Sequence, residues 1–95
     1  MTLQLDTHDP AALLAVLSKY VVLARMDPSC RNIDLLGSVT VPGRYLLVEK
    51  WASPEAQRLH LDSTVMVEMA RSCTGLLTAP PVMDLLDAIS AHDLR

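Results

Sequence analysis

Residues 49–60 read EKWASPEAQRLH, and this stretch places the end of a strand directly before the start of a helix. Ser53 can accept an amide hydrogen bond as an N-cap, while Pro54 lacks the amide that would go unpaired in the first turn. Glu55 adds the acidic charge that suits a helix N-terminus. The pattern therefore predicts a helix that begins at Pro54 and continues through His60.

The preceding run, Arg44 to Trp51, has the two-residue period of a strand. Tyr45, Leu47, Glu49 and Trp51 fall on one face, because successive strand side chains point to opposite sides. A carboxylate and the chain's only tryptophan are thus predicted to point the same way.

An earlier strand is expected from Arg31 to Val41, with apolar residues at most odd positions and Asn32 on the polar face. Gly37 is a weak point in this run and a candidate β-bulge. Pro42-Gly43 is a turn signal, so the two strands are expected to form a hairpin.

At the N-terminal end, Leu3 and Leu5 alternate with polar residues and predict a short strand. Asp9 followed by Pro10 has the cap and first-residue pattern of a helix, which the apolar spacing extends to about Met26.

Toward the C-terminal end, Asp62-Ser63 offers a second cap and predicts a bent or two-part helical segment that ends near Gly75. Val82 to Ser90 is compatible with either a helix or a strand. The prolines before it and the topology favour a last strand.

The resulting order, β-α-β-β-α-β, is the α+β ferredoxin-like arrangement, with an antiparallel sheet that carries its helices on one face. Residues 1–95 are expected to form one domain. The bare face of the sheet needs cover, and 51% of the residues are hydrophobic. We therefore expect a homodimer in which two sheets pack together.

Composition excludes several classes of function. The net charge of -3 and the scattered basic residues argue against nucleic-acid binding. No apolar run is long enough for a membrane helix and no secretory signal is evident, so we expect no membrane partner and a cytoplasmic location. Cys30 and Cys73 form neither a disulfide framework nor a zinc motif, so reduced buried thiols and no metal site are expected.

The stretch 49–60 resembles the E-x-W-x-S-x-E-A-x-x-x-H signature of the antibiotic biosynthesis monooxygenase family, whose members are dimeric α+β barrels. The Pro28 to Cys30 segment and the turn at residues 42–45 agree with it. The resemblance implies a dimer with a pocket in each subunit between the sheet and its helices. It also implies oxidation of phenols or quinols by molecular oxygen with no metal, flavin or other cofactor.

Three residues are candidates for the chemistry within this resemblance. Trp51 could stack on a flat substrate and donate a hydrogen bond, or simply pack in the core. His60 could act as a base, or be a buried histidine satisfied by a carboxylate such as Glu49. Asn32 could donate to a substrate carbonyl, or face solvent on its strand.

A second set could bind the substrate. Tyr45 shares the face of Trp51, and Glu49 lies between them. Met66, Met69 and Leu77 could line an adaptable apolar pocket, although core or dimer packing explains them as well. The chain has no Phe and three aromatic residues in all, which favours a small or aliphatic ligand over a polycyclic one.

The leading hypothesis is a cofactor-independent monooxygenase acting on a small phenol or quinol. The alternatives are a non-catalytic dimeric protein that binds a small aromatic or quinol ligand in the same cavity, and an isomerase-like enzyme. Haem degradation is disfavoured. The haem-degrading members of the family use an Asn on the first strand and a Trp on the second helical segment, and this chain lacks both at those positions.

Overall fold

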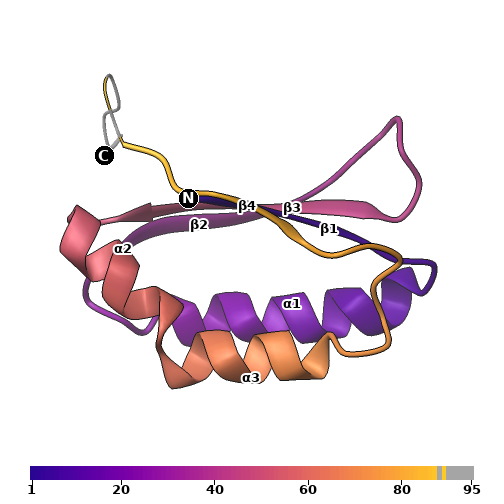
Figure 1. The fold of residues 1–95 in the computed structure, drawn as a ribbon, viewed down its shortest axis with the longest axis horizontal. Helices are drawn as coiled ribbons and strands as arrows, with labels where there is room; N and C mark the ends of the chain where they lie inside the picture. Colours follow the sequence, from indigo (N-terminus) through magenta and orange to yellow (C-terminus); the bar gives the residue numbers. More distant parts are fainter. Residues whose placement is uncertain (88, 90–95) are drawn as a thin grey trace.

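The computed structural model describes residues 1–87 and 89 and confirms the α+β ferredoxin-like fold (Figure 1). Its helices are α1 (Pro10–Ala24), α2 (Pro54–Leu61) and α3 (Thr64–Ser72), and its strands are β1 (Thr2–Asp6), β2 (Cys30–Gly37), β3 (Arg44–Trp51) and β4 (Val82–Asp84). The predicted two-part helical segment is thus present as α2 and α3.

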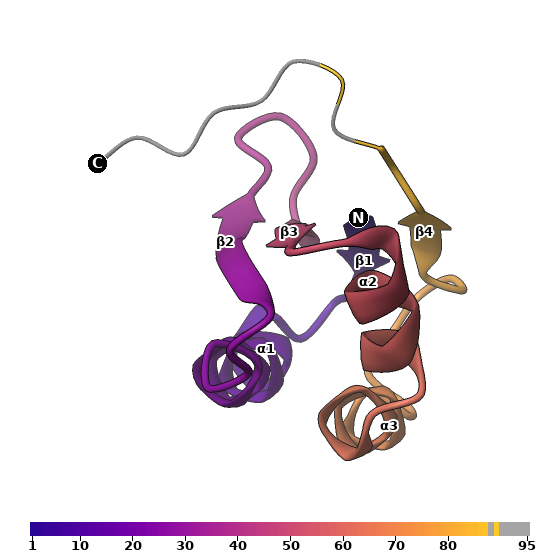
Figure 2. The same ribbon diagram turned by 90° about the vertical axis from the view of Figure 1, so that its left-hand side faces the viewer.

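The sheet has the antiparallel order β2-β3-β1-β4, and all helices lie against one of its faces (Figures 1 and 2). Helices α1 and α3 run side by side beneath the sheet, while α2 descends from the end of β3. No helix in the described part of the chain has the length and apolar character that crossing a bilayer requires.

The predicted helix starts are confirmed by their hydrogen bonds. The carboxylate of Asp9 accepts from the amide of Ala12 at 3.2 Å. Ser53 caps α2 in the same way, and Ser63 caps α3 with a bond of 3.2 Å from the amide of Met66. Because these caps act within a few residues, they are visible in the sequence.

The core lies between the sheet and the helices. Alternate residues of each strand point inward, so Leu3 and Leu5 of β1 meet the buried face of α1, which includes Leu13 and Leu17. Ile33 is fully buried on the same side, which confirms the predicted alternation on β2.

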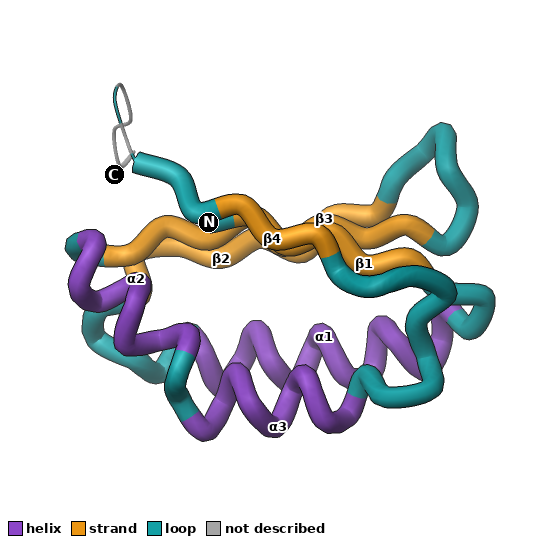
Figure 3. The backbone as a smooth tube through the Cα atoms, in the orientation of Figure 1, coloured by secondary structure: helices purple, strands orange, loops and turns teal. Residues whose placement is uncertain are grey.

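The strand predicted over residues 31–41 ends four residues early, at Gly37. The hydroxyl of Ser38 accepts hydrogen bonds from the amides of Thr40 and Val41 and thereby starts a loop, seen in Figure 3 between β2 and β3. The bulge predicted at Gly37 is also wrong. The irregularity in pairing lies between Cys30 and Asn32.

Gly43 closes this loop at a position that only glycine fits. Its φ is +78°, and a Cβ atom there would collide with the carbonyl oxygen of Thr7. The amide of Thr7 donates to the Gly43 carbonyl at 2.9 Å, so the hairpin loop is fastened to the end of β1.

The last strand is shorter than the predicted Val82 to Ser90, because β4 ends at Asp84. Asp84 pairs with Thr2, the first residue of β1, so the neighbouring strand offers no further partner. Ser90 and residue 88 lie outside the described residues. The predicted helix ends at residues 26 and 75 are also too late, since α1 ends at Ala24 and α3 at Ser72.

Candidate functional site

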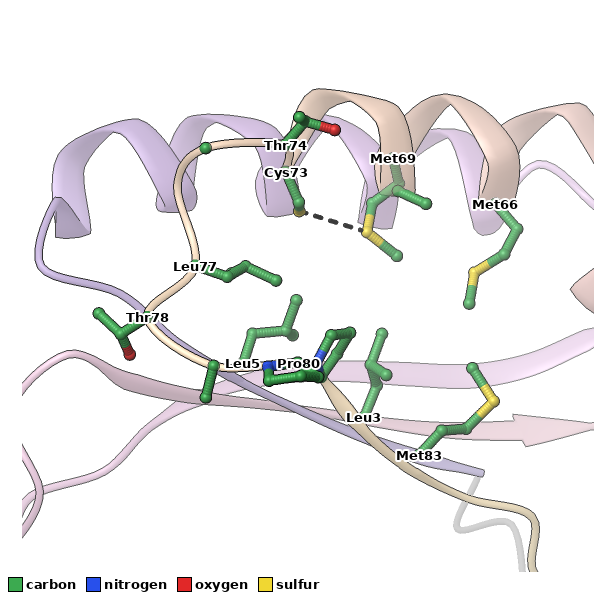
Figure 4. A pocket seen from close by; sticks show the side chains of 14 residues that line it. Leu3, Leu5, Met66, Met69, Cys73, Thr74, Leu77, Thr78, Pro80 and Met83 are labelled. Atoms are coloured by element: carbon green, nitrogen blue, oxygen red, sulfur yellow. Dashed lines mark hydrogen bonds between the residues drawn. The ribbon is translucent and has the colours of Figure 1, made fainter.

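An apolar cavity of about 560 Å³ lies between the sheet and α3 (Figure 4). Met66 and Met69 reach into it from α3, and Leu3 and Leu5 face them from β1. The connection from α3 to β4 closes one side. Of the fourteen described residues that line this cavity, none is aromatic, acidic or basic.

The connection from α3 to β4 is held in place by bonds to the end of β1. The hydroxyl of Thr7 donates to the carbonyl of Leu76 at 2.6 Å, and the amide of Thr78 donates to the carbonyl of Asp6 at 2.8 Å. Gly75, with a φ of +81°, makes the turn that leaves α3. This wall of the cavity is therefore fixed by hydrogen bonds to its backbone, one of them from the Thr7 side chain.

The residues predicted to form the site fall into separate places. Met66, Met69 and Leu77 line the cavity, and their role in substrate binding stays a prediction. Tyr45 is half-buried on the inner face of β3, next to Gly37 of β2, and does not line the cavity.

Asn32 lies on the face of the sheet away from the helices. It is exposed, and its side-chain amide donates to the carboxylate of Asp34 at 3.1 Å. The sheet therefore separates Asn32 from the cavity of its own subunit, and the catalytic role predicted for Asn32 stays untested.

Glu49 is the centre of a buried polar cluster at the α2 end of the sheet, which we call the Glu49 network and which consists of Tyr20, Glu49, Trp51 and His60. Its carboxylate accepts from the Tyr20 hydroxyl at 2.8 Å and from the Trp51 indole N–H at 3.1 Å. The network thus ties α1 to β3.

His60 joins α2 to the same cluster. Its Nε2 atom lies 2.6 Å from the Tyr20 hydroxyl and 3.6 Å from Oε1 of Glu49. The imidazole also stacks on the Trp51 ring, with centroids 4.1 Å apart. His60 is 3% exposed, which corresponds to the interpretation of a buried histidine that contacts Glu49.

Burial controls the charges of this network. Burial raises the pKa of Glu49, although the hydrogen bonds from Tyr20 and Trp51 act in the opposite direction. Burial also lowers the pKa of His60 and, together with the nearby Glu49 carboxylate, raises the pKa of Tyr20. The neutral forms of His60 and Tyr20 are therefore favoured.

The contacts define one consistent arrangement of protons when Glu49 is ionised. An ionised carboxylate can only accept hydrogen bonds, so the Tyr20 hydroxyl donates its hydrogen to Glu49. The oxygen of the same Tyr20 hydroxyl then accepts a hydrogen bond from Nε2–H of His60. Nδ1 is then an acceptor that faces the Ser63 hydroxyl at 3.5 Å. No buried side-chain nitrogen or oxygen among the described residues lacks a partner.

Two contributions were not foreseen from the sequence. Tyr20 completes the Glu49 network; the only signal for it was a hydroxyl-bearing residue within the apolar stripe of a helix. Cys73 lines the cavity, and its thiol contacts the thioether of Met69 at 3.8 Å. Burial raises the pKa of the Cys73 thiol, so it is held in the neutral form.

Cys30 and Cys73 are both free, although Cys30 is only partly buried. Among residues 1–87 and 89, no three His, Cys, Asp or Glu side chains gather closely enough to hold a metal ion.

Comparison with known families gives one match. The model of the antibiotic biosynthesis monooxygenase family matches residues 2–72, which is more than half of the chain. The chain belongs to the antibiotic biosynthesis monooxygenase family. The family match ends at Ser72, the last residue of α3, whereas the residues that line the cavity continue to Met83. A search of the curated proteins found no match.

Solved structures share the fold of this family member. A crystal structure of an antibiotic biosynthesis monooxygenase has a TM-score of 0.83 at 19% identity, covering 94% of this chain and 96% of the other. Rv0793 from Mycobacterium tuberculosis is 26% identical with a TM-score of 0.78 and coverages of 94% and 95%. A Nitrosomonas europaea protein of unknown function has a TM-score of 0.86 at 18% identity, with coverages of 99% and 91%.

Proposed function

We propose that this chain is a cofactor-independent monooxygenase that oxidises a small phenol or quinol with molecular oxygen. The observation that carries the proposal is the apolar cavity of about 560 Å³ between β1, β4 and α3. Its volume falls in the usual range of small-molecule sites. Membership of the monooxygenase family supports the same reaction class.

The proposed reaction needs no electron donor other than the substrate. A quinol loses a proton, and the anion gives electrons to oxygen as a carbon–oxygen bond forms. One oxygen atom stays on the ring, and the other leaves as water after the O–O bond breaks. A quinol and O₂ thus give a hydroxyquinone and water, with the ring oxidised and oxygen reduced.

The cavity suits this reaction because its lining is largely apolar, so a bound ring would exchange contacts with water for contacts with apolar side chains. Since no described lining residue is basic, the proton passes to water at the cavity mouth. The Glu49 network supports the fold and does not contact the substrate. Its members Trp51 and His60 contact Glu49 and Tyr20 and do not line the cavity.

We also propose that two copies form a dimer through the open sheet face. Opposite the helices, β2, β3 and β4 present apolar side chains, among them Leu36, Val48 and Val82, which are 49%, 37% and 54% exposed. Packing a second sheet on this face would bury them. Sedimentation that shows only monomers at high concentration would contradict this arrangement.

The monooxygenase proposal is tested by oxygen uptake with a panel of hydroquinones, using protein dialysed against a chelator. With isotopically labelled oxygen gas, one labelled atom is expected in the hydroxyquinone and one in water. Leu77→Trp fills the cavity and is expected to lower uptake by about tenfold or more, because substrate and indole compete for the same volume. Leu59→Trp, on an exposed part of α2, is the matched control.

His60→Ala separates a chemical role from a structural one. A catalytic His60 predicts loss of oxygen uptake with substrate affinity unchanged. A structural His60 predicts a fall in stability, while the folded protein keeps its uptake and its affinity. Binding of a hydroquinone with no uptake from any quinol would overturn the monooxygenase proposal.

That outcome would favour the second candidate, a non-catalytic protein that holds a metabolite in the cavity. One observation supports it: the only described lining side chains with a hydroxyl or thiol group are Cys73, Thr74 and Thr78, none of which is an ordinary base at neutral pH.

A further inference from the structure

The apolar cavity has a buried floor and an exposed rim. The rim is formed by exposed residues, which include Ala70 of α3, Pro80 of the connection to β4 and Met83 of β4 itself. The floor consists of the lining residues that are at most 8% exposed, which are Leu3, Leu5, Met66, Met69 and Cys73. A ligand in the cavity therefore meets shielded side chains at the floor and water at the rim.

The floor offers a ligand almost no hydrogen bonds. Among its five side chains the only donor is the thiol of Cys73, a weak one that already contacts the thioether of Met69 at 3.8 Å. The side chains of Thr74 and Thr78 point away from the cavity (Figure 4). A polar ligand group placed against the floor would thus lose its hydrogen bonds to water without replacement, which is unfavourable.

The connection from α3 to β4 adds few donors to the lining. Pro80 and Pro81 have no amide hydrogen, and the amide of Thr78 already donates to the carbonyl of Asp6. None of the described lining residues carries a charge. The part of a ligand that lies on the floor must therefore be hydrocarbon, while its polar group stays at the rim, where water solvates it.

The volume and the thioethers favour a flexible ligand. A cavity of about 150 Å³ is enough for benzene, so about 560 Å³ leaves space beyond a single ring. Met66 and Met69 present flexible thioethers that can follow an irregular chain. No described lining residue is aromatic, so the lining lacks flat walls against which a rigid ring system would stack.

We propose that the cavity binds an amphiphilic ligand, with a flexible aliphatic chain on the floor and a single polar group at the rim. This inference goes beyond the proposed function, because it names a chemistry that the lining accepts whether or not the bound molecule is oxidised.

Binding of eight-carbon chains, measured by calorimetry under nitrogen, tests this proposal. 1,8-Octanediol has the chain of 1-octanol and a second hydroxyl, which would have to lie on the floor. The diol is therefore expected to bind at least about tenfold more weakly than 1-octanol. Equal affinities for the two alcohols would overturn the proposal.

Octanoate tests the position of the polar group. Because its charged group stays in water at the rim, octanoate is expected to bind within about fivefold of 1-octanol. A loss of about a hundredfold or more would show that the polar group is buried, and would overturn the orientation. From 1-butanol to 1-octanol, each methylene added on the floor is expected to tighten binding by up to about fourfold.

Substitutions on the floor test its lack of polar partners. Met69→Gln places an amide on the floor with little change in side-chain length, so the preference for 1-octanol over the diol is expected to fall below about threefold. Met26→Gln is the matched control, because Met26 is 71% exposed and does not line the cavity, and is expected to keep the preference.

A milder pair of variants guards against misfolding. Cys73→Ser adds a hydroxyl to the floor with little change in volume and is expected to reduce the preference for 1-octanol severalfold. Cys30→Ser, at the other free and only partly buried cysteine, is expected to leave it unchanged. An unchanged preference in Met69→Gln and Cys73→Ser, with folding verified by circular dichroism, would overturn the assignment of the floor.

Oxygen uptake with hydroquinones is measured separately. Uptake by a protein that binds no 1-octanol would contradict this ligand class and leave the monooxygenase proposal standing. Binding of 1-octanol with the expected preferences, but without uptake from any quinol, would support the ligand class and contradict the monooxygenase proposal.

Discussion

Between the sheet and its helices, the α2 end is filled by the Glu49 network, whereas the α3 end contains an open apolar cavity of about 560 Å³. The sequence signature at residues 49–60 supplies three of the four network residues and none of the described lining of the cavity. The signature therefore specifies the framework of the fold.

The lining of the cavity depends on a different part of the chain. Much of it comes from the connection that follows residue 72, where the family match ends. The network and the cavity are thus built largely by separate segments of this chain.

The largest effect is expected for Glu49→Ala. It removes the acceptor of the Tyr20 hydroxyl and the Trp51 indole N–H, leaving buried donors unpaired. The free energy of unfolding is expected to fall by about 3 kcal/mol or more, measured by urea denaturation. Met83→Ala, at a cavity residue that is 39% exposed, is expected to lower it by less than about 1.5 kcal/mol.

Similar losses of unfolding free energy in Glu49→Ala and Met83→Ala would contradict the expectation that the Glu49 network contributes more to stability than the cavity lining. If Glu49→Ala does not fold, Glu49→Gln retains an acceptor for the indole and is expected to be the milder of the two.

A smaller effect is expected for Tyr20→Phe, which removes the hydroxyl shared by Glu49 and His60. We expect a loss of about 1 to 2 kcal/mol in unfolding free energy, with hydroquinone binding unchanged because the cavity is lined by other residues. Tyr45→Phe is the matched control and is expected to stay within about 0.5 kcal/mol. A Tyr20→Phe protein that lost ligand binding while remaining folded would show that the two ends are coupled.

The smallest effect concerns pH. Because burial lowers the pKa of His60 in the folded state, the unfolded chain takes up the proton first as the pH falls below about 6.5. The stability from His60 is present above that pH and is lost as the pH falls through the folded pKa. Glu49 acts oppositely, since its raised pKa means that stability is lost as the pH rises through the folded value.

Comparing the parent with His60→Gln isolates the histidine, because both proteins retain Glu49. The unfolding free energy of the variant is expected to decline less steeply than that of the parent between pH 7 and pH 5. Urea denaturation at each pH measures this decline. If the unfolding free energies of the two proteins changed in parallel with pH, this pH dependence would not come from His60.

The sequence by itself determined the parts of this protein that depend on local hydrogen bonds and on periodicity. Asp9, Ser53 and Ser63 cap their helices through bonds that span three residues, and the alternation on β3 places Glu49 and Trp51 on the buried face. Such signals involve neighbours in the chain, so they are present before folding.

Tertiary structure decided what depends on distant partners. The length of β4 is limited by the end of β1, because Asp84 already pairs with Thr2. Tyr20 is brought to Glu49 across 29 positions in the chain. Asn32 is placed on the face opposite the cavity by the sheet itself. The cavity forms only where β1, α3 and the segment after it converge, and no local pattern encodes such a convergence, since it arises from packing between elements that are far apart in sequence.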